Sequence, residues 1–352
     1  MTFYLFAIVV LCIYQIRIYQ KLEFCEDYLS RENTTSIKGI FVLLVVAQHF
    51  ITYVKLDGIY DGGYLQLRQF LGQNIVTVFL FYSGYGVLES IKRKGKDYIR
   101  KMPVKRFLLT LIHFDFAVLL FVLVDHFLKK QFPARTVLLA FTGWTGIGNS
   151  NWYVFAALCT YLFTWISFLV LYKHPFGTLI LTTALSAGYI LVVHHYRPDE
   201  GWWYNTVLCY AEGMWYSYFK EDIERLLFDK KHLLLYYILL ILSALGVIMG
   251  RAYIYHLPVY IMWTMCFTGM VVLVTMKVSV HNKILYWLGC YTFEIYILQR
   301  IPMMIFSQIG WMKERTYLFL ICTVGATLLI AKVFHEILKC LDKKILFLTK
   351  AG

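Results

Sequence analysis

The stretch SIKGIFVLLVVAQHF, residues 36–50, decides the fold class of this chain. It is apolar and about as long as a membrane span needs, so we expect a transmembrane helix. Lys38 and His49 are eleven residues apart, and eleven steps of about 100° return almost to the starting angle, so they share one stripe of the helix. Val42 and Val45 lie on the same stripe. His49 is then about 16 Å deeper than Lys38, and an ionisable ring at that depth indicates function because it is costly to bury.

The composition extends this interpretation to the whole chain. Of the 352 residues, 60% are apolar, whereas soluble domains have about half. Apolar runs of membrane length recur from end to end, so we predict an all-α, polytopic transmembrane bundle in contact with the lipid bilayer. The net charge of +13 indicates cytoplasmic loops and no nucleic-acid partner, because the cations lie mostly between the apolar runs. The eight cysteines form no CxxC pair, so neither a metal site nor a disulfide framework is indicated.

The apolar runs predict about eleven spans and an orientation. The spans are approximately 3–19, 37–54, 74–91, 107–128, 152–172, 177–195, 203–219, 233–250, 257–277, 284–306 and 316–340. The loop KRKGKDYIRKMPVKR, residues 92–106, has eight cations and must be cytoplasmic. Alternation of the spans then places the N-terminus outside, the C-terminus inside and Lys38 at the cytoplasmic edge.

Three further stretches contain polar or small residues at membrane depth. In FLFYSGYG, residues 79–86, Ser83 and the glycines either contact a ligand or form a close helix interface. TGWTGIGNSNWY, residues 142–153, reads as a glycine-rich outer loop that dips into the protein, with Trp152 and Tyr153 as rim contacts or as interfacial anchors. In YTFEIYILQRIP, residues 291–302, Glu294 and Gln299 are about 140° apart around a helix and cannot serve one site together.

Four of these stretches together resemble the acyltransferase family 3 membrane proteins, which O-acylate cell-surface glycans and related molecules. SIKGIFVLLVVAQHF resembles the opening helix of that family, and FLFYSGYGVLE resembles its aromatic-rich FF-x-SG segment. NWYVFAAL and YWLGCYTFEIYILQR resemble its tryptophan-aromatic segment and its late LG-x-x-S/T-x-x-IYL-x-H segment. Three features depart from the pattern, one being that the short cytoplasmic Arg-rich signature of the family is not matched cleanly. Lys38 stands where Arg is usual, and Gln299 stands where a second His is common and cannot transfer a proton.

The resemblance implies transfer of an acyl group, most often acetyl, from a coenzyme A thioester to a hydroxyl of a cell-surface or exported glycan. It points to His49 as the general base, because a neutral imidazole can take a hydroxyl proton near pH 7. Cations would attract the phosphates of acetyl-CoA or another acyl-CoA, although the 92–106 loop is equally explained by topology alone. The cations in question are Lys38, Arg93, Arg100, Lys101 and Arg106. The residues expected to contact the carbohydrate or lipid-linked acceptor are Ser83, Trp152, Tyr153, Glu294 and Gln299.

The resemblance also implies a division of the chain. Residues 1–35 would form an extra N-terminal transmembrane helix with a cytoplasmic linker, residues 36–341 an acyltransferase-like membrane domain of ten helices, and residues 342–352 a short basic cytoplasmic tail. We expect a multi-pass protein of the bacterial inner membrane, with assembly into a homo-oligomer left open. The alternatives are a multi-span transporter or flippase for a polar solute or glycan, which the lack of an inverted repeat disfavours, and an inactive relative of the acyltransferases.

Overall fold

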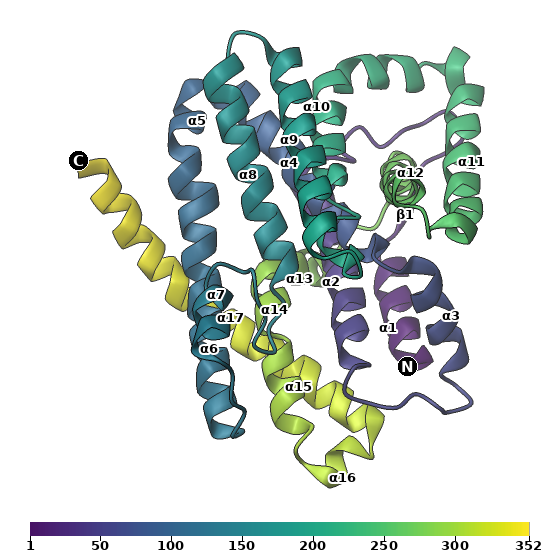
Figure 1. Cartoon of the computed structure of the whole chain (residues 1–352). Helices are drawn as coiled ribbons and strands as arrows, with labels where there is room; N and C mark the ends of the chain where they lie inside the picture. The colour runs from purple at the N-terminus through teal and green to yellow at the C-terminus, as the bar shows by residue number, and fades with distance from the viewer. Residues whose placement is uncertain (352) are drawn as a thin grey trace.

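The computed structural model describes the backbone of residues 1–351 and the side chains of residues 1–346. This part of the chain is a helical bundle (Figure 1) in which only two short strands occur, β1 (Arg17–Ile18) and β2 (Val278–Ser279), paired antiparallel. The first eight helices are α1 (Thr2–Ile13), α2 (Arg31–Phe50), α3 (Gly62–Leu71), α4 (Asn74–Lys94), α5 (Lys96–Met102), α6 (Leu109–Phe127), α7 (Ala134–Ala140) and α8 (Trp152–Leu171). The others are α9 (Pro175–Tyr196), α10 (Leu208–Leu227), α11 (Leu233–Gly250), α12 (Leu257–Thr275), α13 (Lys283–Cys290), α14 (Thr292–Leu298), α15 (Arg300–Phe306), α16 (Gly310–Lys313) and α17 (Thr316–Ala351).

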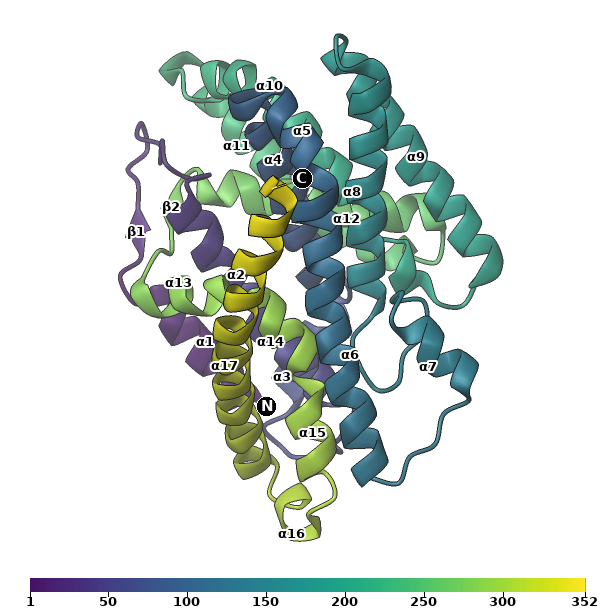
Figure 2. The ribbon, with the colours of Figure 1, turned by 90° about the vertical axis from the view of Figure 1, so that its left-hand side faces the viewer.

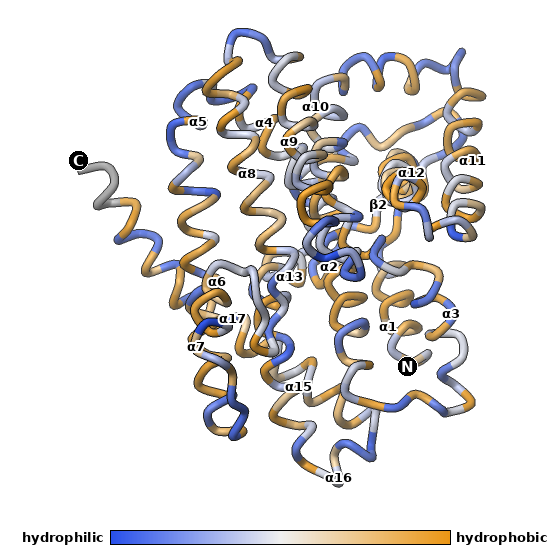
Figure 3. The backbone as a smooth tube through the Cα atoms, viewed as in Figure 1, coloured by the Kyte–Doolittle hydropathy of each residue, from blue (hydrophilic) through white to orange (hydrophobic). Residues whose placement is uncertain are grey.

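The all-α, polytopic prediction is confirmed, because seven helices of the described residues are long and apolar enough to cross a membrane. They are Asn74–Lys94, Lys96–Phe127, Trp152–Leu171, Pro175–Tyr196, Lys230–Tyr253, Leu257–Thr275 and Thr316–Leu346. Figure 3 shows apolar residues along these helices and hydrophilic residues around α5 and at the turn between α8 and α9. The count of eleven spans, the orientation of the termini and the domain boundaries at residues 35 and 341 remain predictions. Gly352 and the side chains of residues 347–352 of the predicted basic tail lie outside the described residues.

The expected spans 3–19 and 284–306 differ most from the helices of the structure. In the first range, 3–19, the helix ends at Ile13, because the chain then extends into β1 and pairs with β2. The range 284–306 is divided into α13, α14 and α15, with breaks at Tyr291 and Gln299. The second break has a local cause: Pro302 lacks an N–H, so the carbonyl of Leu298 loses its helical partner.

Two close contacts between helices, each made at a glycine, fix the positions of α2 and α4. A methyl group on Gly39 of α2 would overlap the carbonyl oxygen of Leu285 in α13. A methyl on Gly84 of α4 would likewise overlap the carbonyl oxygen of Tyr210 in α10. Small residues of this kind let two membrane helices approach to backbone distance. Figure 2 shows the long helix α17 beside α14 and α15, which it also contacts.

We expect Gly84→Ala to lower the melting temperature of the detergent-purified protein, because the added methyl overlaps a backbone atom that cannot move aside. Overpacking of this kind costs roughly 1–3 kcal/mol. Gly86→Ala is the matched control on the same helix, since a methyl there meets nothing within 4 Å. Equal melting temperatures of the two variants, measured by fluorescence during heating, would contradict the close contact between α4 and α10.

Candidate active site

A cavity of about 1050 Å³ lies between α2, α4, α8, α13 and α14 and extends to the start of α6 and to α17. It is elongated: its lining residues on α4 run from Val76 to Arg93, a rise of about 25 Å. The Arg93 end is the one that the charge distribution predicts to face the cytoplasm. Side chains around the Val76 end are apolar or aromatic, namely Val42, Val76, Phe79, Tyr153, Val154 and Tyr296.

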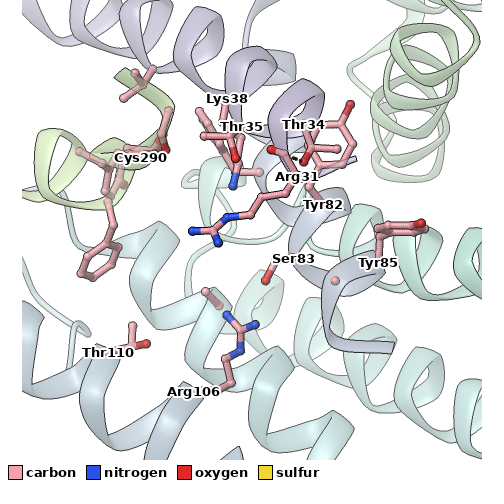
Figure 4. A pocket seen from close by; sticks show the side chains of 18 of the residues that line it. Arg31, Thr34, Thr35, Lys38, Tyr82, Ser83, Tyr85, Arg106, Thr110 and Cys290 are labelled. Atoms are coloured by element: carbon pink, nitrogen blue, oxygen red, sulfur yellow. Dashed lines mark hydrogen bonds between the residues drawn. The ribbon is translucent and has the colours of Figure 1, made fainter. Parts of the chain in front are cut away.

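The opposite end of the cavity is strongly basic. Figure 4 shows Arg31 and Lys38 extending from α2 into the space that Arg106 enters from the other side. Arg93 also lines this end. Glu89 is the one carboxylate among the described lining residues, and it is engaged by the Ser217 hydroxyl at 2.8 Å. The cavity therefore has an excess of positive charge and suits an anionic ligand.

Arg106 owes its position to a local distortion of the helix. Residues Pro103–Leu108 form a π-helical turn between α5 and α6, as is common where a proline removes a backbone donor and at functional sites. The Nε of Arg106 donates a hydrogen bond to the Tyr98 hydroxyl at 2.8 Å, and its guanidinium lies 6.0 Å from the centroid of the Tyr161 ring. The guanidinium is thus held in place before any ligand binds.

Three of the five predicted donor-binding cations line the cavity, namely Lys38, Arg93 and Arg106. Arg100 and Lys101 do not. Both are exposed on α5, whose Ile99 and Met102 are buried. Arg100 and Lys101 therefore lie on the exposed face of α5, which points away from the cavity.

The predicted acceptor-binding residues do not form one group. Ser83 and Tyr153 line the cavity, and the Ser83 hydroxyl shares a 2.8 Å hydrogen bond with the Tyr161 hydroxyl. Trp152 packs edge-on against Tyr153, with ring centroids 5.9 Å apart, and does not line the cavity. Glu294 and Gln299 lie in different parts of the structure, in agreement with the angle of about 140° between them around a helix.

His49 lies outside the cavity, although Lys38 and Val42 of the same helical stripe line it. The His49 ring centroid is 6.1 Å from that of Tyr296, which in turn is 5.4 Å from that of Tyr153. Both tyrosines line the cavity, so His49 lies beside a residue of the cavity wall. Nδ1 of His49 is 3.5 Å from the Ser150 hydroxyl.

The cavity wall also holds a carboxylate–imidazole pair that the sequence did not reveal. Nδ1 of His335 on α17 is 2.6 Å from Oε1 of Glu294, which is buried on α14. His335 lines the cavity, and the Tyr291 ring packs edge-on against it at 5.0 Å. A neutral His335 that donates its Nδ1 proton to Glu294 keeps Nε2 free to accept a proton. The pair is 41 residues apart in the chain, so no local pattern could predict it.

Arg31 also lines the cavity but was not among the predicted donor-binding cations, although the sequence contains a signal for it. It precedes Lys38 by seven residues, about two helical turns, and so lies on the same face of α2. The described residues contain no group of three His, Cys, Asp or Glu side chains that could hold a metal ion.

Comparison with known proteins adds one match. A family model described as an acyltransferase domain matches residues 35–335 of the chain. The matched range contains every residue that lines the cavity except Leu29, Arg31 and Thr34. No curated protein and no solved structure matches the chain.

Proposed function

Because this integral membrane protein belongs to the acyltransferase family whose model covers residues 35–335, we propose that it is an O-acyltransferase of the bacterial inner membrane. The resemblance inferred from four short motifs is confirmed by that match. In the proposed reaction the protein takes an acetyl group from acetyl-CoA and passes it to a hydroxyl of a cell-surface or exported glycan. Family membership favours this function over a transporter or a flippase.

The excess of positive charge in the cavity supports acetyl-CoA as the donor and the cavity as its binding site. Coenzyme A has phosphates at its nucleotide end and an uncharged arm that ends in the thioester. Arg31, Arg93 and Arg106 suit the phosphates, since guanidinium groups bind them in a bidentate geometry. The uncharged arm would run toward Phe79 and Tyr153 at the apolar end. The acetyl group would then lie beside the wall that faces His49.

His49 is the proposed general base. Its imidazole would take the proton of the acceptor hydroxyl as the oxygen attacks the thioester carbonyl. The carbon–oxygen bond forms, the carbon–sulfur bond breaks, and coenzyme A leaves as a thiolate that is protonated in the cavity. His49 does not line the cavity and lies beside the cavity residue Tyr296, so we infer that the Tyr296 ring turns aside during the reaction. His335 lines the cavity, and once its Nε2 has accepted a proton, the imidazolium held by Glu294 can supply that proton to the thiolate.

A plug in the cavity tests the donor assignment. We expect Gly86→Trp to abolish binding of acetyl-CoA, measured by calorimetry on the purified protein, because the indole would extend into the donor space. Gly86 lines the cavity and has open space around it, so the fold should tolerate the change. Gly86→Ala is the matched control and should bind acetyl-CoA like the unmodified protein. Equal affinity of the Trp and Ala variants would refute the placement of the donor.

A further inference from the structure

Residues 17–34 precede the range matched by the family model, yet they are bonded to the segment that connects α12 to α13. In that connection β1 pairs with β2 (Figure 2), and the backbone N–H of Tyr19 donates to the carbonyl of Lys277 at 2.9 Å. The Ser279 hydroxyl donates to Oδ1 of Asn33, in the first turn of α2, at 2.7 Å. The connecting segment therefore holds both the N-terminal strand and the start of α2.

Lys277 is the centre of this junction. It is 8% exposed, and its Nζ donates hydrogen bonds to the backbone carbonyls of Gln20 at 3.1 Å, Lys21 at 2.9 Å and Glu23. The ammonium also lies 3.7 Å from the centroid of the Phe24 ring, which adds a cation–π attraction. Each of its three N–H donors thus has an acceptor. Because a buried ammonium is costly unless it is bonded in this way, Lys277 ties the N-terminal segment to the end of α12.

Arg31 is the residue that this junction delivers to the cavity. It is the first residue of α2, where the partial positive charge of a helix N-terminus disfavours a cation. Its guanidinium forms no hydrogen bond or ion pair with any described residue. It extends instead into the cavity (Figure 4), where Lys38 lies within electrostatic range of both Arg31 and Arg106. Three cations gathered in this way repel one another, and an anionic ligand relieves the repulsion.

The position of Arg31 along the cavity indicates which part of the donor it meets. Among the lining residues of α2, Arg31 is the farthest from Val42 at the apolar end. The thioester is expected at that apolar end, so Arg31 faces the part of acetyl-CoA that is most distant from the thioester. The charged group there is the 3′-phosphate on the ribose, since the pyrophosphate adjoins the uncharged arm.

We propose that Arg31 selects the donor by binding this 3′-phosphate, and that Lys277 is the positioning residue that holds Arg31 at the cavity. A guanidinium suits the role because it binds a phosphate in a bidentate geometry. This inference rests on the proposed acyltransferase function. It adds a donor-selecting residue that lies outside the range matched by the family model.

The test measures binding of two ligands to the purified full-length protein by calorimetry. The ligands are acetyl-CoA and acetyl-3′-dephospho-CoA, which lacks only that phosphate. The unmodified protein should bind acetyl-CoA about 10-fold more tightly, the effect of one charge-assisted contact to a phosphate. Arg31→Gln should bind both ligands equally, as weakly as the unmodified protein binds the dephospho ligand. Lys277→Met keeps the apolar stem but removes the ammonium, and it should lose most of the preference. The double variant should bind no more weakly than Arg31→Gln alone.

Lys283→Met is the matched control, because Lys283 is an exposed cation six residues after Lys277 and does not line the cavity. It should keep the full preference. Ser279→Ala tests the same junction should Lys277→Met fail to fold, since it removes only the hydrogen bond to Asn33. It should lower the preference about threefold, as expected for one neutral hydrogen bond.

Equal binding of the two ligands by the unmodified protein would overturn the inference, and so would a full preference in Arg31→Gln. The positioning role is wrong if Lys277→Met, or Ser279→Ala in its place, keeps the full preference or weakens both ligands by the same factor. Failure of the unmodified protein to bind acetyl-CoA would instead refute the proposed function itself.

Discussion

Replacing His49 by Gln is expected to reduce acetyl transfer by about 10²- to 10⁴-fold, the usual contribution of a general base. The amide is similar in size to the ring and can still donate a hydrogen bond to Ser150, but it cannot take the proton of a hydroxyl. Binding of acetyl-CoA should not change, because His49 does not line the donor cavity. The measurement is transfer of label from acetyl-CoA to envelope glycans by purified protein, together with the donor affinity.

Two other histidines make this experiment specific. His126→Gln replaces an exposed ring on α6 and should leave transfer unchanged. His335→Gln removes the imidazole that Glu294 holds in the cavity wall, and it should slow release of coenzyme A more than it affects the attack on the thioester. If His335→Gln abolishes transfer and His49→Gln does not, the base is the cavity histidine and the assignment to His49 is wrong. Measurable acetyl transfer by the unmodified protein would also exclude the alternative that this chain is an inactive relative of the acyltransferases.

Removing the cations of the cavity should produce the second large effect. We expect Arg106→Gln to weaken acetyl-CoA binding by about 10- to 100-fold, which corresponds to the loss of one charge-assisted hydrogen bond to a phosphate. Lys38→Gln should have a similar effect from the opposite wall. Because Arg106 also bonds to Tyr98, the Lys38 variant separates a loss of ligand contact from a change in local structure.

Arg100→Gln is the matched control for charge. It removes a cation from the same basic segment, but Arg100 is exposed and does not line the cavity. We expect it to lower the affinity by less than about twofold, and that small effect should vanish at high salt, since exposed charges are screened. An equal loss of affinity in Arg100→Gln and Arg106→Gln would mean that the loop acts only through its total charge.

The structure divides the stripe of α2 that holds Lys38 and His49 between two places. Lys38 lines the cavity, whereas His49 does not and lies beside the Tyr296 ring. The same division holds for α14 and its neighbour: Glu294 holds His335 in the cavity wall, and Gln299 lies near His49. Lys38 and Glu294 thus belong to the cavity and its wall, whereas His49 and Gln299 lie beside it.

The sequence by itself determined the helical class, the membrane setting, the family and the shared stripe of Lys38 and His49, because these follow from local hydropathy and the fixed rotation of a helix. It also placed Glu294 and Gln299 on different faces for the same reason. Only the tertiary structure decided that Arg106 enters the cavity while Arg100 turns away, and that His335 meets Glu294. Those outcomes depend on how helices distant in sequence pack through contacts such as Gly84 against Tyr210, and no local pattern encodes which face of a helix its neighbours will cover.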